Sequence, residues 1–171
     1  TIIFLALNAK IILTPTLSTS GEGGSSSSKR GIALRDLYKG YKQLDKKENE
    51  ILEEISFELP GKTHLFNFEK VSKRTHLDIA SVNTAIKIKI EGKIILEADL
   101  SAGGVGPIPM YLKKTSSFLK DKKVSQETVE EAIEIAQSEI SPISDARGSE
   151  EYKRLLLGQL IKAHFITLFP T

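Results

Sequence analysis

The sequence predicts an α+β fold in which helices cover one face of an antiparallel β-sheet. Residues 85–90 (AIKIKI) alternate apolar and charged side chains, as a strand with one buried face does. Glu91 and Gly92 form a tight turn that returns the chain into a second strand over residues 93–102. Beyond residue 125, two long stretches repeat apolar residues at helical spacing, and they follow the strands instead of alternating with them.

The beginning of the chain predicts short elements. Residues 2–7 are apolar enough for the end of a buried helix, and residues 9–13 for a buried strand. Periodicity alone does not separate the two states in runs this short. Residues 14–28 are rich in Gly and Ser, which leave little to bury, so we expect an exposed hairpin connection there.

Three further elements are expected before residue 60. Residues 31–34 resume a short strand, and residues 36–41 predict a turn of helix packed by Leu37 and Tyr41. Residues 50–59 predict a longer strand. Its alternating apolar side chains are Ile55, Phe57 and Leu59.

Pro60 and Gly61 end this strand, and we place a boundary there between units at residues 1–60 and 61–171. The second unit opens with a strand over residues 65–71, in which two Phe residues recur at strand spacing. Together with the hairpin described above, this strand predicts a sheet with one polar face and one covered face.

Helices are predicted to cover this sheet. Ser125 and Ser149 are the expected N-caps of the two long helices, each with acidic side chains in the first turn. Residues 111–120 predict a third, shorter helix. The predicted buried stripe of the first long helix is Val129, Ala132, Ile133, Ala136 and Ile140. That of the second is Tyr152, Leu155, Leu156, Leu160, Ala163 and Ile166.

Composition narrows the function classes. A net charge of +2, with basic and acidic residues interleaved, disfavours binding to nucleic acid or to an anionic membrane. The chain has no Cys and its three His residues lie far apart, so neither a disulfide nor a metal site is predicted. The apolar residues 1–13 are too short to span a bilayer and lack the features of a signal peptide. We interpret this uncapped apolar start as the beginning of a fragment, and we expect a cytoplasmic protein.

Three motifs each allow a structural and a functional interpretation. Residues 103–107 (GGVGP) form either a phosphate-binding loop or a sharp turn where backbones approach closely, and the missing donor side chains favour the turn. Residues 70–74 (KVSKR) form either a solvated charged loop or a loop that reaches a cofactor, and physical reasoning alone favours the former. Ser116, Ser117 and His164 lack the sequence context of a catalytic triad, and we expect His164 to interact with a helix C-terminus.

Several segments together resemble one family. FEKVSKRTHLDIASVN (residues 68–83), GGVGPIPM (103–110) and SPISDARGSEEYKRLLLGQLIKAHF (141–165) are similar to the C-terminal domain of the FAD-binding medium subunit or module of molybdenum hydroxylases. Xanthine dehydrogenase and carbon monoxide dehydrogenase belong to that group, and the last segment resembles xanthine dehydrogenase more. Upstream, LALNAKIIL, LRDLYKGYKQLD and ENEILEEISFELP resemble the end of the family's FAD-binding domain. The resemblance implies that residues 1–60 are the C-terminal remnant of that domain and 61–171 the flavoprotein C-terminal domain.

The resemblance also implies which residues border FAD. Leu52 matches a Leu of the family's E-I-L strand, and Lys70 matches a Lys that leaves the next domain's first strand. A register shift of one residue would place Glu69 there instead. Asp78 and Ile79 match a D-I pair in the loop beside the isoalloxazine ring. Ile79 would supply an apolar wall, while Asp78 and Lys70 would bias the flavin potential; no catalytic residue is implied.

The function implied by the resemblance is electron transfer. In such enzymes a molybdenum cofactor oxidises the substrate, iron–sulfur clusters carry electrons to FAD, and the flavin reduces NAD or another acceptor. The molybdopterin and the 2Fe–2S clusters belong to other domains or subunits, and a glycine-rich FAD-binding segment would precede Thr1.

We therefore expect part of a cytoplasmic oxidoreductase of purine catabolism, and an isolated chain that is inactive and binds FAD weakly or not at all. The alternative is a non-enzymatic α+β interaction module, a homologue fragment without flavin binding, whose apolar sheet edge docks a partner.

Overall fold

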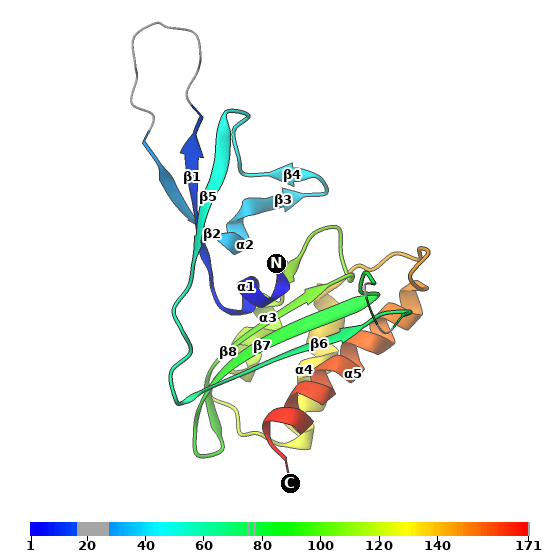
Figure 1. Cartoon of the computed structure of the whole chain (residues 1–171). Helices are drawn as coiled ribbons and strands as arrows, with labels where there is room; N and C mark the ends of the chain where they lie inside the picture. Colours follow the sequence, from blue (N-terminus) through cyan, green and yellow to red (C-terminus); the bar gives the residue numbers. More distant parts are fainter. Residues whose placement is uncertain (17–27, 75, 77, 171) are drawn as a thin grey trace, which may run out of the picture.

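The structure, a computed structural model, describes residues 1–16, 28–74, 76 and 78–170, and it contains two regions with separate antiparallel sheets (Figure 1). The first region consists of α1 (Ile2–Ala6), β1 (Lys10–Pro15), β2 (Arg30–Ala33), α2 (Leu34–Leu37), β3 (Tyr38–Gly40), β4 (Gln43–Leu44) and β5 (Glu50–Ser56). The second consists of β6 (His64–Val71), β7 (Val82–Glu91), β8 (Ile94–Gly103), β9 (Met110–Tyr111), α3 (Lys113–Leu119), α4 (Gln126–Glu139) and α5 (Glu150–Leu168). Strands followed by segregated helices confirm the predicted α+β fold.

The first region is built around β1, which pairs with β2 on one side and β5 on the other. Its side chains Ile11 and Leu13 are fully buried. The predicted helix at residues 2–7 and the three predicted strands are therefore present. The last strand, however, ends at Ser56, because its partner β1 begins opposite that residue at Lys10. Most of the predicted loop at residues 14–28, namely 17–27, lies outside the described residues.

The prediction for residues 36–41 is wrong in its second half. The helix ends at Leu37, whose side chain is buried as expected. The chain then becomes extended as β3 and reverses at Lys42, which has a φ of 57°. Tyr41 lies at this reversal and is 68% exposed, so it packs against no helix.

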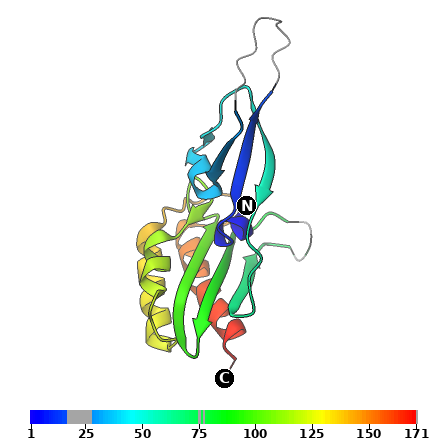
Figure 2. The ribbon, with the colours of Figure 1, turned by 90° about the vertical axis from the view of Figure 1, so that its left-hand side faces the viewer.

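The second region has a four-stranded sheet in the order β6-β7-β8-β9. The alternation in β7 places Ile86 and Ile88 in a core beneath the helices, together with Leu100 of β8. These three side chains are fully buried, so the Ile-Lys alternation of β7 marks its buried face correctly. Figure 2 shows the three-stranded sheet standing above this second sheet, with α1 between them.

The opposite face of the sheet is not uniformly polar, which corrects the prediction. Lys87 and Lys89 lie there as expected, paired with Asp99 and Glu97 respectively. Ala85, however, is fully buried in the core of the first region, which also packs against Phe66 and Phe68. The physical reason is that α1 covers this end of the sheet, whereas the other end stays open to solvent.

Both predicted N-caps are confirmed, because the Oγ atoms of Ser125 and Ser149 accept hydrogen bonds from backbone N–H groups of α4 and α5. The predicted stripe of α4 is also correct, with Ile133 half-buried and the rest buried. The stripe of α5 is wrong in part, because Tyr152, Leu155 and Ile166 are exposed. Two polar residues of α5 account for the error in the predicted stripe. Lys153 and His164 lie on the buried face of α5, which shifts the apolar stripe around the helix.

Candidate functional site

Three segments that are distant in the sequence meet at one end of the second sheet. They are the loop after β6 (described for residues 72–74, 76 and 78–81), the glycine-rich segment 103–109 and the segment 141–149 that leads into α5. Ser81 Oγ donates to the carbonyl of Arg147 at 2.8 Å. The backbone N–H of Ser141 donates to the carbonyl of Val105 at 3.0 Å. These contacts join all three segments into one surface.

The glycine-rich segment is a sharp turn with close backbone approach, as the missing donor side chains suggested. Gly104 has a φ of +82°, and a Cβ atom there would lie 2.2 Å from the carbonyl oxygen of Ser81. A Cβ on Gly103 would lie 2.3 Å from Oδ1 of Asn83. Side chains at either position would therefore push the glycine-rich segment away from the start of β7.

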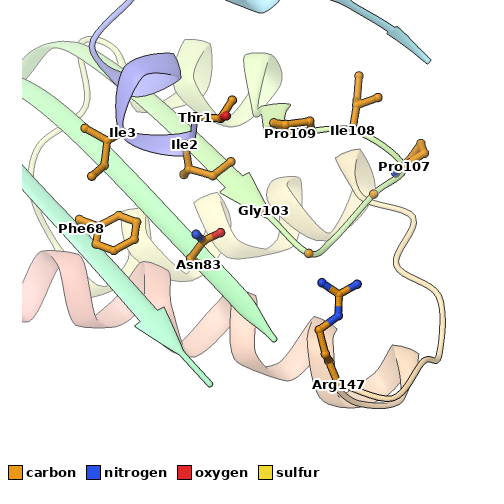
Figure 3. A pocket seen from close by; sticks show the side chains of 12 residues that line it. Thr1, Ile2, Ile3, Phe68, Asn83, Gly103, Pro107, Ile108, Pro109 and Arg147 are labelled. Carbon is orange, nitrogen blue, oxygen red and sulfur yellow. The ribbon is translucent and has the colours of Figure 1, made fainter. Parts of the chain in front are cut away.

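A cavity of about 470 Å³ opens beside these segments (Figure 3). Phe68 of β6 and Asn83 of β7 lie on its floor, Ile108 lies on its rim, and the guanidinium of Arg147 points into it from the segment before α5. Its wall thus combines apolar side chains with an amide and a cation. The residues that line the cavity are Thr1, Ile2, Ile3, Phe68, Asn83, Gly103, Gly104, Gly106, Pro107, Ile108, Pro109 and Arg147.

Lys70 and Glu69 lie on opposite faces of β6. Lys70 pairs in register with Asn83, one of the cavity residues, and its side chain is exposed. Glu69 instead accepts a hydrogen bond from Nδ2 of Asn67 at 2.8 Å, on the face that packs against α5. Because residues opposite each other in an antiparallel pair share a face, Lys70 is directed to the side of the cavity and Glu69 is not.

The loop after β6 brings Lys70, Asp78 and Ile79 together. Nζ of Lys70 donates to the carbonyl of Asp78 at 2.7 Å. The Asp78 carboxylate accepts the backbone N–H groups of Arg74 and Ile79, each at 2.9 Å. The hydrogen bond from the Arg74 N–H, with the nearby guanidinium, lowers the pKa of Asp78. The ionised carboxylate of Asp78 therefore stabilises the conformation of its own loop. Ile79 projects from that loop, and 71% of its surface is exposed.

Leu52 lies apart from these three residues. It belongs to β5 in the three-stranded sheet of the first region, opposite Leu13 of β1, and is 42% exposed. Figure 1 shows β5 and the loop after β6 in different parts of the molecule, although both lie on the same side of it in Figure 2. The structure thus groups three of the four predicted site residues and leaves the fourth in the other region.

The expectation for His164 is wrong. Its ring is fully buried between α5 and the sheet, where Nε2 lies 2.8 Å from Oγ1 of Thr84 and Nδ1 lies 3.0 Å from Nδ2 of Asn67. Burial lowers the pKa of His164 to about 4. The neutral imidazole thus accepts from the Asn67 amide and donates to Thr84, instead of interacting with a helix C-terminus.

Ser116 and His164, two of the residues considered for a catalytic triad, make separate hydrogen bonds. Oγ of Ser116 accepts the backbone N–H of Leu100 on the side of the sheet near α3. His164 has Thr84 and Asn67 as its hydrogen-bond partners. Within the described part of the chain, no group of three or more His, Asp or Glu residues is arranged to hold a metal ion.

Sequence reasoning missed Phe68, Asn83 and Arg147 as cavity residues. Phe68 and Asn83 carry a weak signal, since each lies near the end of a strand that borders the recognised loop. Arg147 lies in a short polar turn between two helices, within a segment that contributed to the family resemblance. No spacing rule connects these three positions, because only the tertiary fold brings them together.

None of the helices in the described residues is both long enough and apolar enough to cross a membrane.

Comparison with known proteins gives a consistent result. The family described as "CO dehydrogenase flavoprotein C-terminal domain" matches residues 68–168. Xanthine dehydrogenase 1 of Arabidopsis thaliana is 32% identical over 126 residues, which cover 70% of this chain and 9% of that protein. The glyceraldehyde dehydrogenase medium chain of Sulfolobus acidocaldarius is 30% identical over 154 residues, which cover 90% of this chain and 50% of that protein.

A solved structure shares the fold. The carbon monoxide dehydrogenase of Hydrogenophaga pseudoflava, in a form that lacks the Mo-pyranopterin moiety of its molybdenum cofactor, superposes with a TM-score of 0.83 at 22% identity. The match covers 95% of this chain and 53% of the matched chain. The present chain therefore spans about half the length of the glyceraldehyde dehydrogenase medium chain and of the matched carbon monoxide dehydrogenase chain, and much less of the xanthine dehydrogenase.

Proposed function

The chain belongs to the CO dehydrogenase flavoprotein C-terminal domain family, and from this premise we propose that it forms one wall of the flavin site in a molybdenum hydroxylase. The wall would serve an FAD-carrying module that passes electrons from iron–sulfur clusters to NAD or another acceptor. A xanthine dehydrogenase-like enzyme of the cytoplasm, acting on purines, is the specific form we propose. The observation that carries the proposal is the loop after β6, where the carbonyl of Asp78 accepts a hydrogen bond from the Lys70 ammonium and the next residue, Ile79, exposes an apolar side chain.

The residues present suit a flavin. The isoalloxazine ring has flat apolar faces and a polar edge, so it needs an apolar wall and charged or hydrogen-bonding groups nearby. Ile79 offers an exposed apolar surface, and Lys70 offers an ammonium group at the same loop. A bound FAD would supply the redox chemistry, and these side chains would position it and adjust its electrostatics.

Asp78 has a supporting part in this proposal. Its carboxylate is already occupied by two backbone N–H groups of the loop, so it shapes the loop rather than offering a free charge to a ligand. Its carbonyl holds the ammonium of Lys70 at the loop. Lys70 in turn favours electrons added nearby, because a cation stabilises developing negative charge at short range.

Leu52 and further FAD-binding segments would complete the proposed flavin site, and the iron–sulfur clusters and the molybdenum cofactor would belong to other domains or subunits. Leu52 would touch the cofactor from β5, on the same side of the molecule as the loop after β6 (Figure 2). We propose that glycine-rich FAD-binding segments, outside these 171 residues, hold the rest of the cofactor. The isolated chain is then expected to bind FAD weakly or not at all.

The test is a fusion of this chain to the half of the Sulfolobus acidocaldarius medium chain that it does not match. We expect the fusion to retain FAD through gel filtration, while the 171-residue chain alone does not. Ile79→Asp should weaken FAD retention about tenfold, because a buried aliphatic contact contributes roughly 1.5 kcal/mol. Lys70→Met should shift the flavin midpoint potential to a more negative value, since it removes a nearby cation.

Two matched controls are available on α5. Ile166→Asp changes a side chain of equal exposure (72%) far from the loop, and Lys162→Met removes an exposed cation there. Both should leave retention and potential unchanged. A fusion that holds no flavin, or an Ile79→Asp variant that behaves like Ile166→Asp, would contradict the proposal. So would stoichiometric flavin absorbance that co-purifies with the 171-residue chain alone, because it would show that no further segment is needed.

The second candidate is an interaction module without flavin. It is favoured by β5, a strand at the edge of its sheet in the described residues that exposes Ile51, Leu52 and Ile55. Exposed apolar edge strands pair with other chains. This candidate predicts that Ile51→Lys with Ile55→Lys abolishes association with a partner and leaves FAD retention of the fusion unchanged. The flavin proposal instead predicts that Leu52→Lys lowers the FAD retention of the fusion, because Leu52 would touch the cofactor.

A further inference from the structure

A buried lysine in α5 has no part in the flavin wall proposed above. Lys153 is only 2% exposed, which is rare for a lysine. Its Nζ lies 2.9 Å from Oδ1 of Asp145 and donates to the carbonyl of Ile143 at 2.7 Å. Both partners belong to the segment just before the helix, so the ammonium is directed at that segment and not at solvent.

The segment forms a closed turn at residues 145–148. The backbone groups of Asp145 and Gly148 exchange two hydrogen bonds, at 3.0 and 3.1 Å. The Asp145 carboxylate also accepts the backbone N–H of Arg147 at 2.8 Å and its guanidinium at 2.8 Å. The Lys153 ammonium, followed by these Arg147 donors, holds the pKa of Asp145 below its usual range. Lys153 therefore fixes the turn through a carboxylate that stays ionised.

The closed turn presents two carbonyl groups to the loop after β6. Nζ of Lys73 donates to the carbonyl of Ala146 at 2.6 Å. Oγ of Ser81 donates to the carbonyl of Arg147 at 2.8 Å. Lys73 lies just after β6 and Ser81 just before β7, so the turn is hydrogen-bonded to the loop near both of the loop's ends.

We propose that Lys153 is a positioning residue, which holds the loop carrying Asp78 and Ile79 in place through the turn at residues 145–148. The link to a flavin rests on the proposed function, whereas the mechanical link from α5 to the loop does not. The chain of contacts runs from Lys153 to Asp145, from the turn to Lys73 and Ser81, and from there to the residues that Asp78 organises.

The charge on Lys153 matters more than its packing volume in this arrangement. Methionine has similar length and fills the same buried space, but it binds neither Asp145 nor the carbonyl of Ile143. Asp145 would keep its Arg147 contacts, so Lys153→Met leaves that carboxylate paired. The substitution thus releases one side of the turn without creating a large cavity.

The test is backbone amide hydrogen exchange, resolved by NMR, on the 171-residue chain without flavin. The reporters are the N–H groups of Arg74, Ile79 and Ser81, each of which donates a hydrogen bond within or at the end of the loop. Lys153→Met should speed their exchange about five- to tenfold, the factor that corresponds to the loss of one ordinary hydrogen bond. Lys73→Met, at an exposed site, should speed it about two- to threefold.

A double-mutant cycle separates positioning from general stability. If Lys153 acts through the turn, Lys73→Met should add less in the Lys153→Met background than in the unmodified chain. The amides of Ile86 and Ile88 in the core of β7 should keep their protection, and Lys162→Met, an exposed lysine of the same helix, should change nothing.

Two results would overturn the inference. One is loop exchange at the original rate in Lys153→Met. The other is an equal rise at Ile86 and Ile88, which would make Lys153 a stabiliser of the whole domain. Because the measurement needs no flavin, a failure of the FAD-retention test affects only the proposed function, and a failure here affects only the positioning role.

Discussion

The two regions of the molecule bury their apolar side chains in different ways. The core of the second region is drawn entirely from residues between Val82 and Phe165, and it lies between one sheet face and helices α3, α4 and α5. The core of the first region includes Ala85 of β7 and packs against Phe66 and Phe68 of β6. The first region thus completes its core with the back face of the other region's sheet.

This difference indicates that stability and function are distributed unequally. A region with a closed core can hold its shape alone, whereas one that borrows core residues depends on the contact between the two. The first region also leaves Ile51, Leu52 and Ile55 exposed along β5. The proposed flavin wall draws on both regions, so their contact has to be firm for the site to keep its geometry.

The largest expected effect comes from the closed core. Leu157 of α5 is fully buried there, and Leu157→Ala should lower the free energy of unfolding by about 4 kcal/mol, because it removes apolar contacts and leaves a cavity. Urea unfolding followed by circular dichroism measures this loss. Leu155→Ala, two residues earlier and exposed, should change stability by less than about 0.5 kcal/mol. Equal losses for the two variants would mean that the core does not decide stability.

The next largest effect is expected at Ala85, the β7 residue that belongs to the core of the first region. Ala85→Asp would bury a carboxylate beneath α1 without a charged partner, at a cost of about 3 kcal/mol. Hydrogen exchange should rise throughout α1 and β1, while Ile86 and Ile88 on the other face of β7 stay protected. Ala85→Gly, which removes the Cβ atom and adds no charge, should cost only about 1 kcal/mol. Uniform loosening of both regions by Ala85→Asp would show that they form one cooperative core.

Much of the closed core could be predicted from the sequence, whereas the place of Ala85 in the core of the first region could not. The Ile-Lys alternation of β7 and the capping serines at 125 and 149 are local signals, and each led to a correct element. The burial of Ala85 depends on where α1 lies, which no local pattern encodes. The stripe of α5 failed for a related reason: Lys153 and His164 are buried because tertiary partners satisfy them, and polar residues give no such hint in sequence.

The candidate site also contains residues that could be predicted from the sequence and residues that could not. Lys70, Asp78 and Ile79 were assigned by likeness to a family, and physical reasoning from sequence alone favoured a solvated loop. The cavity residues Asn83 and Arg147 come from β7 and from the turn before α5, and only the fold brings them close. Their assignment to FAD remains a prediction, which the retention and potential measurements above address.

A pH-dependent effect should come from His164 in the closed region. Its pKa is lowered to about 4 in the folded chain, against an unfolded value near 6.5, so the unfolded state binds more protons between these values. The stability from the neutral ring is fully present above about pH 6.5 and is lost as pH falls from there through about 4, by roughly 3 kcal/mol. Urea midpoints measured between pH 7 and 4 follow this loss.

His164→Gln is the control for the pH effect, because an amide can bond to Asn67 and Thr84 but does not titrate in this range. Its stability should decline less between pH 7 and 4 than that of the unmodified chain. If both chains lose the same stability, the acid sensitivity arises elsewhere, for example at the Arg30–Glu50 pair in the first region, where hydrogen bonding to Arg30 lowers the pKa of Glu50 to about 2.

The contact between the two regions includes a polar network around Asp99 of β8. Oδ1 of Asp99 accepts from Nδ2 of Asn8 at 2.9 Å and from the Tyr111 hydroxyl at 2.7 Å, and Oδ2 lies 3.0 Å from Nζ of Lys87. Arg35 donates to Oδ1 of Asn8, and its guanidinium lies 4.4 Å from the centre of the Tyr111 ring. Residues 8 and 35 come from the first region, so this network joins the two.

The smallest predicted effect therefore tests the junction itself. Tyr111→Phe keeps the ring under Arg35 but removes the donor to Asp99, and because Asn8 and Lys87 still satisfy the carboxylate, the loss should be about 1 kcal/mol. The same change made with Arg35→Met should cost less than the sum of the single changes, since both residues act on one network. Urea unfolding gives these energies. Strict additivity would mean that the Tyr111 hydroxyl and Arg35 do not act through one network at this junction.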